Sequence, residues 1–186
     1  MSEDKMKYAD HIEESKKKWT GATPKEQELY QAVLATLASD FLFFWDFLKT
    51  VEKTFDIDAM GIARELRWKH CFAAGQRLSK KFESHGVKDL YDAYNSQFEG
   101  LVGAKWLECN DKAFHKWNFD CPIIPHLKNL GLTEDEMKEM APLFCLADCA
   151  IMKGFNPELE VFPQPALLMA GDSHCAYRTE DHRGEN

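Results

Sequence analysis

Between Cys121 and Tyr177 the chain gathers side chains that could act as nucleophiles, general bases or metal ligands. This segment holds four of the six cysteines, an aspartate after an apolar run and two histidines: Cys121, Cys145, Cys149, Cys175, Asp148, His126 and His174. Thiolates and carboxylates bind divalent cations, and three protein ligands with one water form an open catalytic site. We therefore predict that Cys121, Cys145, Cys175 and Asp148 form the catalytic site, either directly or by holding Mn²⁺ or Zn²⁺.

The spacing of these residues allows them to converge. On a helix, Cys145 and Cys149 lie four positions apart on one face, and Asp148 lies three positions from Cys145 toward roughly the same side. Cys121 follows a predicted strand, whereas Cys175 begins another strand after a tight turn. Asp148 follows the apolar run 141–147, where a carboxylate must form a pair, coordinate a cation or face water. We expect it to serve as a general base or a metal ligand.

A structural role remains the alternative for several of these side chains. Free cysteines are among the most buried residue types, and we favour a core role for Cys71 and Cys149. Cys109 lies in a predicted turn and has no preferred role. No Cys-x-x-Cys pair is present, so the usual signature of a structural zinc site is missing.

Hydrophobic periodicity and capping signals predict helices in the first half of the chain. Thr23, Pro24 and Glu26 form a capping box, and the helix that follows should run to about residue 53. Its residues at spacings of three and four make one apolar stripe: Leu29, Val33, Leu37, Phe41, Phe44 and Leu48. Further helices are predicted from the cap Asp58 to about residue 84 and over 88–98.

The second half mixes strands and helices. Strands are predicted over 101–108, 113–119, 159–162, 166–169 and 175–178. A short helix should end at Gly131, and a capping box at Thr133 should open a helix to about residue 153 that Pro142 kinks or splits. We predict an α+β fold in which N-terminal helices pack on a small antiparallel sheet. The boundaries are a polar arm over 1–20, one domain over 21–179 (helical over 21–100, cysteine-rich over 101–179) and a disordered tail over 180–186.

Charge and composition exclude some classes of partner. The 186-residue chain has a net charge of −8, so no basic face is available for nucleic acid or an anionic membrane. No signal peptide is visible, and no window approaches the roughly 18 uninterrupted apolar residues of a membrane span. We expect a cytoplasmic protein whose cysteines are not a disulfide framework, acting on a small molecule as a homo-oligomer or as a subunit of a larger complex.

The motifs of the second half resemble the L-2-amino-thiazoline-4-carboxylic acid hydrolase family. The matching residues are Cys121-Pro122, Cys145 with Asp148, Asn156-Pro157, and Gly171-Asp172 with Cys175 and Tyr177. The resemblance implies a hydrolase that opens the carbon–nitrogen bond of a cyclic amidine. Such a ring carries a carboxylate, which needs a cationic anchor. The candidates are Arg64, Arg67, Arg77 and Arg178, and we predict that Arg178, Asp172, Trp117 and His126 bind the substrate.

Two other functions remain open. The final motif is similar to that of four-vinyl-reductase-like ligand-sensing domains, so the chain could instead be a non-catalytic module that holds a small molecule or a metal. Residues 162–168 are largely apolar, whereas the hydrolase family usually has a polar strand with Arg and Thr there. This difference favours the non-catalytic module as an alternative. An oligomerising structural protein is the third hypothesis, and it rests on the aromatic helix at 24–53.

Overall fold

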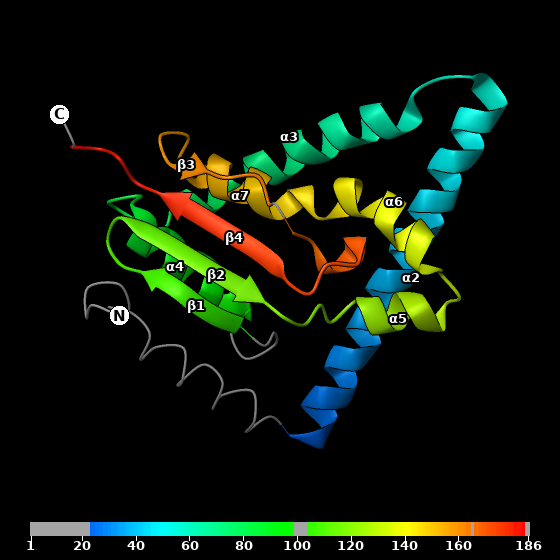
Figure 1. The fold of residues 1–186 in the computed structure, drawn as a ribbon, viewed down its shortest axis with the longest axis horizontal. Coiled ribbons are helices and arrows are strands. Elements are labelled where there is room, and N and C mark those ends of the chain that lie inside the picture. The colour runs from blue at the N-terminus through cyan, green and yellow to red at the C-terminus, as the bar shows by residue number, and fades with distance from the viewer. Residues whose placement is uncertain (1–22, 99–103, 165, 185–186) are drawn as a thin grey trace.

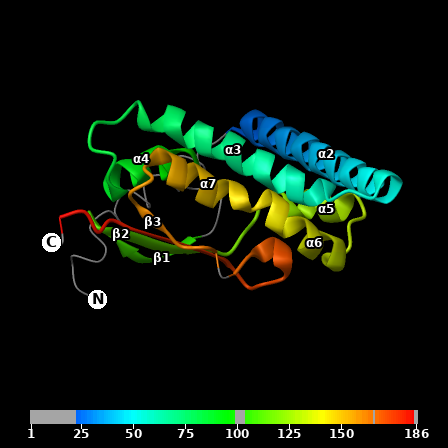
Figure 2. The ribbon, with the colours of Figure 1, turned by 90° about the horizontal axis from the view of Figure 1, so that it is seen from above.

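The computed structural model of the protein describes residues 23–98, 104–164 and 166–184. The predicted arm over 1–20 lies outside these residues. Helices dominate the fold, and one small antiparallel sheet accompanies them, so the predicted α+β class is confirmed. In Figure 1 the long helix α2 (Pro24–Phe55) lies across one end of the sheet. In Figure 2 helices α3, α4 and α7 lie along one face of the sheet.

The sheet is built from four strands in the order β1-β2-β4-β3. Their bounds are Ala104–Cys109 for β1, Ala113–Asn118 for β2, Glu160–Val161 for β3 and Cys175–Glu180 for β4. In the β2–β4 pair, Lys116 lies opposite Tyr177 and Asn118 lies opposite Cys175. Because opposed residues share a face and alternate residues return to it, these four side chains lie on the same face of the sheet.

Helix α2 begins at the predicted capping box, in which the Glu26 N–H donates to the Thr23 hydroxyl. Its buried residues are Leu34, Ala38, Trp45 and Leu48. Most of the predicted apolar stripe lies beside this set and is exposed, including Leu29, Val33, Leu37 and Phe44. The helix is amphipathic, but the packing against α3 and α5 covers a neighbouring stripe.

Among the described helices, α2 alone has the length and composition of a membrane span, with a window of mean hydropathy 1.3. A single helix of this kind is weak grounds for insertion, because core helices of soluble proteins meet the same criteria. The fold therefore gives no firm sign of a membrane protein.

Helix α3 (Ala59–Ser79) begins at the predicted cap, where the Asp58 carboxylate accepts from the Gly61 N–H. It ends five residues before the predicted boundary at Ser84. The backbone N–H groups of Ser84 and His85 donate to the Asp89 carboxylate instead. These bonds direct the chain into α4 (Val87–Phe98).

Helices α5 (Ile124–Asn129), α6 (Glu134–Phe144) and α7 (Leu146–Phe155) follow the sheet hairpin. The capping box at Thr133 opens α6 as predicted. The predicted split after Pro142 is also confirmed, and Cys145 lies at the junction between α6 and α7. The break lies three residues before Asp148, which is in the first turn of α7.

One prediction near the C-terminus is wrong. Residues 166–169 do not form a strand, because Leu168–Ala170 form a 3₁₀ helix closed by Gly171 at φ 94°. The Asp172 carboxylate accepts from the Leu167 N–H, so local turn bonding replaces strand pairing there. The last strand, β4, extends through Glu180, and the Asp181 N–H donates to the Lys112 carbonyl.

Two hydrophobic clusters fill the interior. One lies between the sheet and α4 and α7, with Leu90, Phe114, Met152 and Phe155 at its centre. The other joins α2, α5 and α6 around Trp45, Leu127, Met140 and Phe144. Helices α3 and α7 run side by side and connect the two regions (Figure 2).

Candidate functional site

A cavity of about 340 Å³ lies between the first half of α2 and the end of the sheet. One wall is a stripe of α2. The opposite wall carries polar and thiol groups from β2, β4, α7 and the segment after β2. The lining residues are Tyr30, Leu34, Leu37, Phe41, Lys116, Asn118, Asp120, Cys121, Pro122, Ile123, Asp148, Cys175 and Tyr177. The predicted convergence of Cys121, Asp148 and Cys175 is therefore found.

Asp148 and Tyr177 form the hydrogen bond at the centre of the polar wall. The Tyr177 hydroxyl donates to Asp148 Oδ2 at 3.0 Å. Burial is the largest cause that raises the pKa of Tyr177 well above its usual value, and the charge of Asp148 adds to it. Tyr177 therefore stays a neutral phenol and a hydrogen-bond donor at neutral pH. Asp148 lies in the first turn of α7.

Lys116 and Asn118 lie at the same wall, and the sequence analysis did not select them. Lys116 is 3% exposed, and its Nζ lies 5.5 Å from the centre of the Tyr177 ring. Asn118 is 8% exposed, and no group in the part of the chain that the structure describes donates a hydrogen bond to its Oδ1 atom. A signal was present: two polar residues, Lys116 and Asn118, alternate with His115 and Trp117 and share a face with the apolar Phe114. Polar groups at buried positions of a strand are unusual unless they bind something.

The cysteine thiols around the cavity are neutral at physiological pH. Burial raises the pKa of Cys121 and, more strongly, that of Cys145. It also raises the pKa values of Cys149 and Cys175 to about 11. Nucleophilic attack by cysteine requires the thiolate, which these surroundings disfavour. The site therefore offers Asp148 as its base more readily than any thiol as its nucleophile.

This protonation state predicts slow thiol chemistry. With a pKa of about 11, Cys175 should hold roughly 300-fold less thiolate at pH 7.5 than an ordinary cysteine of pKa about 8.5. We expect iodoacetamide to modify Cys149 and Cys175 slowly, with rates that rise about tenfold per pH unit up to about pH 11. Mass spectrometry of timed samples measures this, with denatured protein as the control. Rapid modification of Cys175 in the folded protein at pH 7.5 would contradict it.

Cys145 and Cys149 open onto a different cavity. Both line a space of about 360 Å³ beside Trp68 and Gln164. The Cys149 thiol lies 3.8 Å from the Phe162 carbonyl. Cys145 still lies near the residues of the first cavity: burial is the largest cause that raises its pKa, and interactions with Cys175, Asp148 and Cys121 add to it. Of the four predicted catalytic residues, Cys121, Asp148 and Cys175 line the main cavity, whereas Cys145 lines the second one. Cys109 is buried in the core, whereas Cys71 is half-buried.

The predicted substrate-binding residues do not line the main cavity. Arg178 and Trp117 are each adjacent to a lining residue, so strand alternation places their side chains on the opposite face of the sheet. Arg178 forms an ion pair with Glu180 there. The Asp172 carboxylate closes the turn at Leu167, and His126 bonds to Gln31. Arg67, another candidate anchor, donates to the Phe144 carbonyl and lines a groove between α2 and α3.

A metal site requires ligand atoms that lie close to one another. Among the described residues, one group brings three ligand atoms within 4.8 Å of one another, and it is Glu160, Glu180 and His182. The set of Cys121, Cys145, Cys175 and Asp148 does not reach this geometry. These four residues as arranged do not fit a metal ion, so their role as ligands stays a prediction and no step below depends on it.

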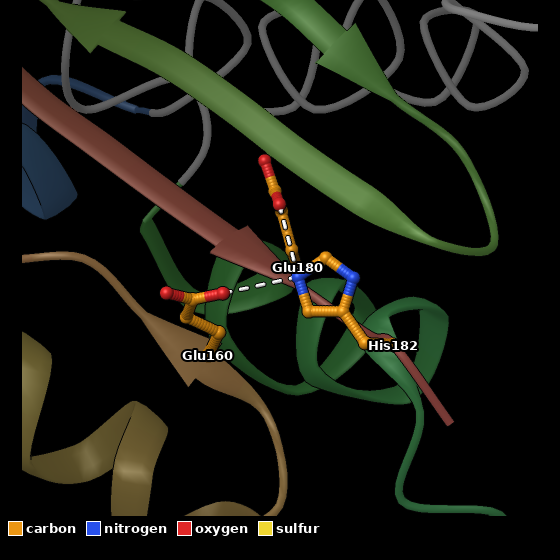
Figure 3. A group of neighbouring side chains, drawn as sticks. All are labelled: Glu160, Glu180 and His182. Atoms are coloured by element: carbon orange, nitrogen blue, oxygen red, sulfur yellow. Dashed lines mark hydrogen bonds and ion pairs between the residues drawn. The ribbon is translucent and has the colours of Figure 1, made fainter. Parts of the chain in front are cut away.

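The cluster of Glu160, Glu180 and His182 lies at the other end of β4 from the cavity (Figure 3). Glu160 and Glu180 are opposed across the β3–β4 pair, which would place like charges together. His182 Nε2 lies between them, 3.0 Å from Glu160 and 3.2 Å from Glu180. Arg178 also contacts Glu180, so the cluster is explained as a surface ion-pair network that fixes the end of the sheet.

Comparison with known proteins identifies the family. The sequence matches the family model described as L-2-amino-thiazoline-4-carboxylic acid hydrolase over residues 39–179, more than half of the chain. The chain belongs to this family. Five of the residues that carry the resemblance to this family line one cavity: Cys121, Pro122, Asp148, Cys175 and Tyr177. Asn156 has a structural role, since its side-chain amide donates to the His85 carbonyl.

The fold is also found outside hydrolases. A crystal structure of a trafficking protein particle complex subunit 3 from Naegleria fowleri, covalently bound to palmitic acid, superposes with a TM-score of 0.53. The sequences are 14% identical, and the alignment covers 82% of this chain and 95% of that one. At this identity the likeness establishes a shared fold alone. No curated protein matches the sequence.

Proposed function

We propose that this member of the aminothiazoline-carboxylate hydrolase family hydrolyses a carbon–nitrogen bond of a small cyclic amidine in the cavity beside Asp148. The observation that carries the proposal is the hydrogen bond from Tyr177 to Asp148 at 3.0 Å within a cavity lined by the family's motif residues. A carboxylate in a concave, partly apolar site with a few converging polar groups is a typical arrangement for general base catalysis.

In the proposed reaction Asp148 accepts a proton from a water molecule as the water oxygen bonds to the amidine carbon. Asp148 returns this proton to the ring nitrogen, which gives a neutral tetrahedral adduct with one hydroxyl. In the second step the hydroxyl proton passes through Asp148 to the same nitrogen, the ring carbon–nitrogen bond breaks, and the new carbonyl forms. Tyr177 holds Asp148 in place, because its hydroxyl stays protonated at neutral pH and donates a hydrogen bond to the carboxylate. Asn118 Oδ1, which accepts no other hydrogen bond, is suited to accept one from the amino group of the amidine.

Lys116 is the cationic anchor that we propose for the substrate carboxylate, in place of the four arginines selected from the sequence. It is buried, it lines the cavity, and it comes from the same strand face as Asn118. A cation in such surroundings interacts with a carboxylate more strongly than one in water does.

Turnover of 2-aminothiazoline-4-carboxylate by the purified protein tests the proposal. We expect ring opening, followed by mass spectrometry of the product, with incorporation of one oxygen from ¹⁸O-labelled water. Denatured protein provides the background rate. Absence of ring opening at protein concentrations that bind the compound would count against the hydrolase function.

A non-catalytic binding module is the second candidate. Two observations favour it: the apolar stripe of α2 along one wall of the cavity, and the neutral state of the neighbouring thiols. The structurally similar trafficking complex subunit carries palmitic acid, which is a bound apolar ligand in this fold. Binding of the amidine without ring opening would support this candidate over the first.

We also propose that the protein forms a homo-oligomer through α2 and α3. A groove of about 560 Å³ between these helices is lined by Phe44, Phe47, Ile62 and Leu66, which are all exposed. A two-fold pairing covers these apolar side chains with those of a second copy, because a symmetric dimer presents the same surface from both subunits. Free thiols at all six cysteines agree with the reducing cytoplasm that we propose as its location.

Sedimentation velocity tests the oligomer. The wild type should sediment as a dimer or larger, and Phe47→Glu should convert it to a monomer because the substitution places a charge in the groove. Leu29→Glu is the matched control, since Leu29 is also exposed on α2 but lies outside the groove. A monomeric wild type would contradict this part of the proposal.

A further inference from the structure

The apolar wall of the main cavity is longer than a small ring requires. Tyr30, Leu34, Leu37 and Phe41 follow one another at spacings of four, three and four, so they form one face of α2. At a rise of 1.5 Å per residue this stripe extends about 16 Å along the helix. A five-membered ring bound at Asp148 covers only part of it. The volume of about 340 Å³ is also in the range of sites for drug-sized ligands.

Part of the apolar stripe, at Leu37, is left uncovered by the described residues and is available to a ligand. Leu37 lines the cavity yet remains 41% exposed. Leu34, three residues earlier, is 7% exposed, and the Phe41 ring stacks on Phe144 with centroids 4.2 Å apart. The wall is thus held by the core on one side and presents apolar surface to the cavity on the other. Covering that surface with an apolar group is favourable by about 25 cal/mol per Å².

The polar wall indicates what the other end of the ligand carries. Asn118 Oδ1 is buried and accepts no hydrogen bond from the described residues (23–98, 104–164 and 166–184), so it is available to accept one from a ligand. Lys116, opposite Tyr177 in the sheet, supplies a buried amino group to the same wall. The polar end of the cavity is therefore suited to a ligand group that carries a hydrogen-bond donor and an anion. The α2 wall is suited to an apolar group.

We infer that the cavity takes an amphiphilic substrate, whose polar head lies at Lys116, Asn118 and Asp148 and whose alkyl or aryl substituent lies along the Leu34–Phe41 stripe of α2. The inference rests on the proposed function for the cyclic amidine in the head. It goes beyond that function by assigning an apolar substituent to the substrate and by making Leu37 a specificity-determining residue. The unsubstituted ring is then a poor substrate compared with its larger relatives.

Equilibrium binding of an inert series tests this. The probes are 2-aminothiazole-4-carboxylate and its 5-methyl, 5-butyl and 5-hexyl derivatives, whose aromatic ring resists hydrolysis, and the measurement is isothermal titration calorimetry. The wild type should bind each longer member more tightly, by roughly three- to fourfold per methylene, which corresponds to about 0.8 kcal/mol per buried CH₂. Affinity that is unchanged or falls with chain length would overturn the inference.

Variants locate the chain in the cavity. Leu37→Gln should reduce the gain to less than about twofold per methylene, because it makes the apolar wall of the cavity polar. Leu29→Gln, on the same helix and 65% exposed, should behave as the wild type. Lys116→Met should weaken all four probes by the same factor. Equal effects of Leu37→Gln and Leu29→Gln would place the chain elsewhere and overturn the inference.

The outcome is separable from the proposed hydrolysis. Chain-length-dependent binding without ring opening of 2-aminothiazoline-4-carboxylate or its 5-alkyl derivatives would refute the hydrolase function and leave the amphiphilic site standing. Ring opening, together with an affinity that does not change with chain length, would support the hydrolase function and overturn the amphiphilic site.

Discussion

Asp148→Asn should lower kcat for amidine hydrolysis by about 10²- to 10⁴-fold, the range expected for loss of a general base. The substitution keeps the size of the side chain and an oxygen that can accept from the Tyr177 hydroxyl, but it removes the group that takes the proton from water. The KM should change less than kcat, since Lys116 and Asn118 still hold the substrate. Initial rates at saturating and limiting substrate measure both quantities.

Asp172→Asn is the matched control for that experiment. Asp172 belongs to the family motif, but it is exposed and its carboxylate accepts from the Leu167 N–H in a turn. Its replacement should leave the rate within a few-fold of the wild type. Thermal unfolding of both variants should show that each is folded. Hydrolysis by folded Asp148→Asn at the wild-type rate would remove Asp148 from the mechanism.

Gly154→Ala should destabilise the fold by about 3 kcal/mol or more, the upper range for overpacking. A Cβ atom at Gly154 on α7 would lie 2.0 Å from the Phe72 carbonyl oxygen of α3. Gly75 on α3 makes the reciprocal approach, where a Cβ atom would lie 2.1 Å from the Ile151 carbonyl oxygen. Both partners are backbone atoms, so the two helices would have to separate. Urea unfolding followed by circular dichroism measures the loss.

Gly86→Ala provides the comparison. An added Cβ atom there comes no closer than 3.5 Å to its neighbour, an ordinary contact with the Arg183 side chain. The cost should be about 1 kcal/mol or less. If Gly154→Ala were no more destabilising than Gly86→Ala, the close approach of α3 and α7 would be contradicted. This approach matters for the site because α7 carries Asp148.

Features encoded by local signals were predictable from the sequence. The capping boxes at Thr23 and Thr133 begin their helices as predicted, and the hairpin of β1 and β2 lies where the period of apolar residues changes. The split after Pro142 follows from the chemistry of that residue. Each of these depends on residues within a few positions of one another.

Features set by tertiary packing were not predictable in the same way. Which stripe of α2 is buried depends on where α5 and α3 pack, so Leu34 is covered and Leu37 is left at a cavity. Strand alternation could have excluded Arg178, because Tyr177 and Arg178 cannot both face the same cavity. The same reasoning could have selected Lys116 and Asn118, had the sheet face toward α7 been known.

The position of a bound amidine tests the central claim, which is that the cavity between α2 and the sheet is the functional site. A crystal structure with 2-aminothiazole-4-carboxylate measures this directly. We expect the ring in this cavity, with its amino group at Asp148 and Asn118 and its carboxylate at Lys116. Density for the compound in the groove between α2 and α3, or beside Trp68 and Cys149, would contradict the account.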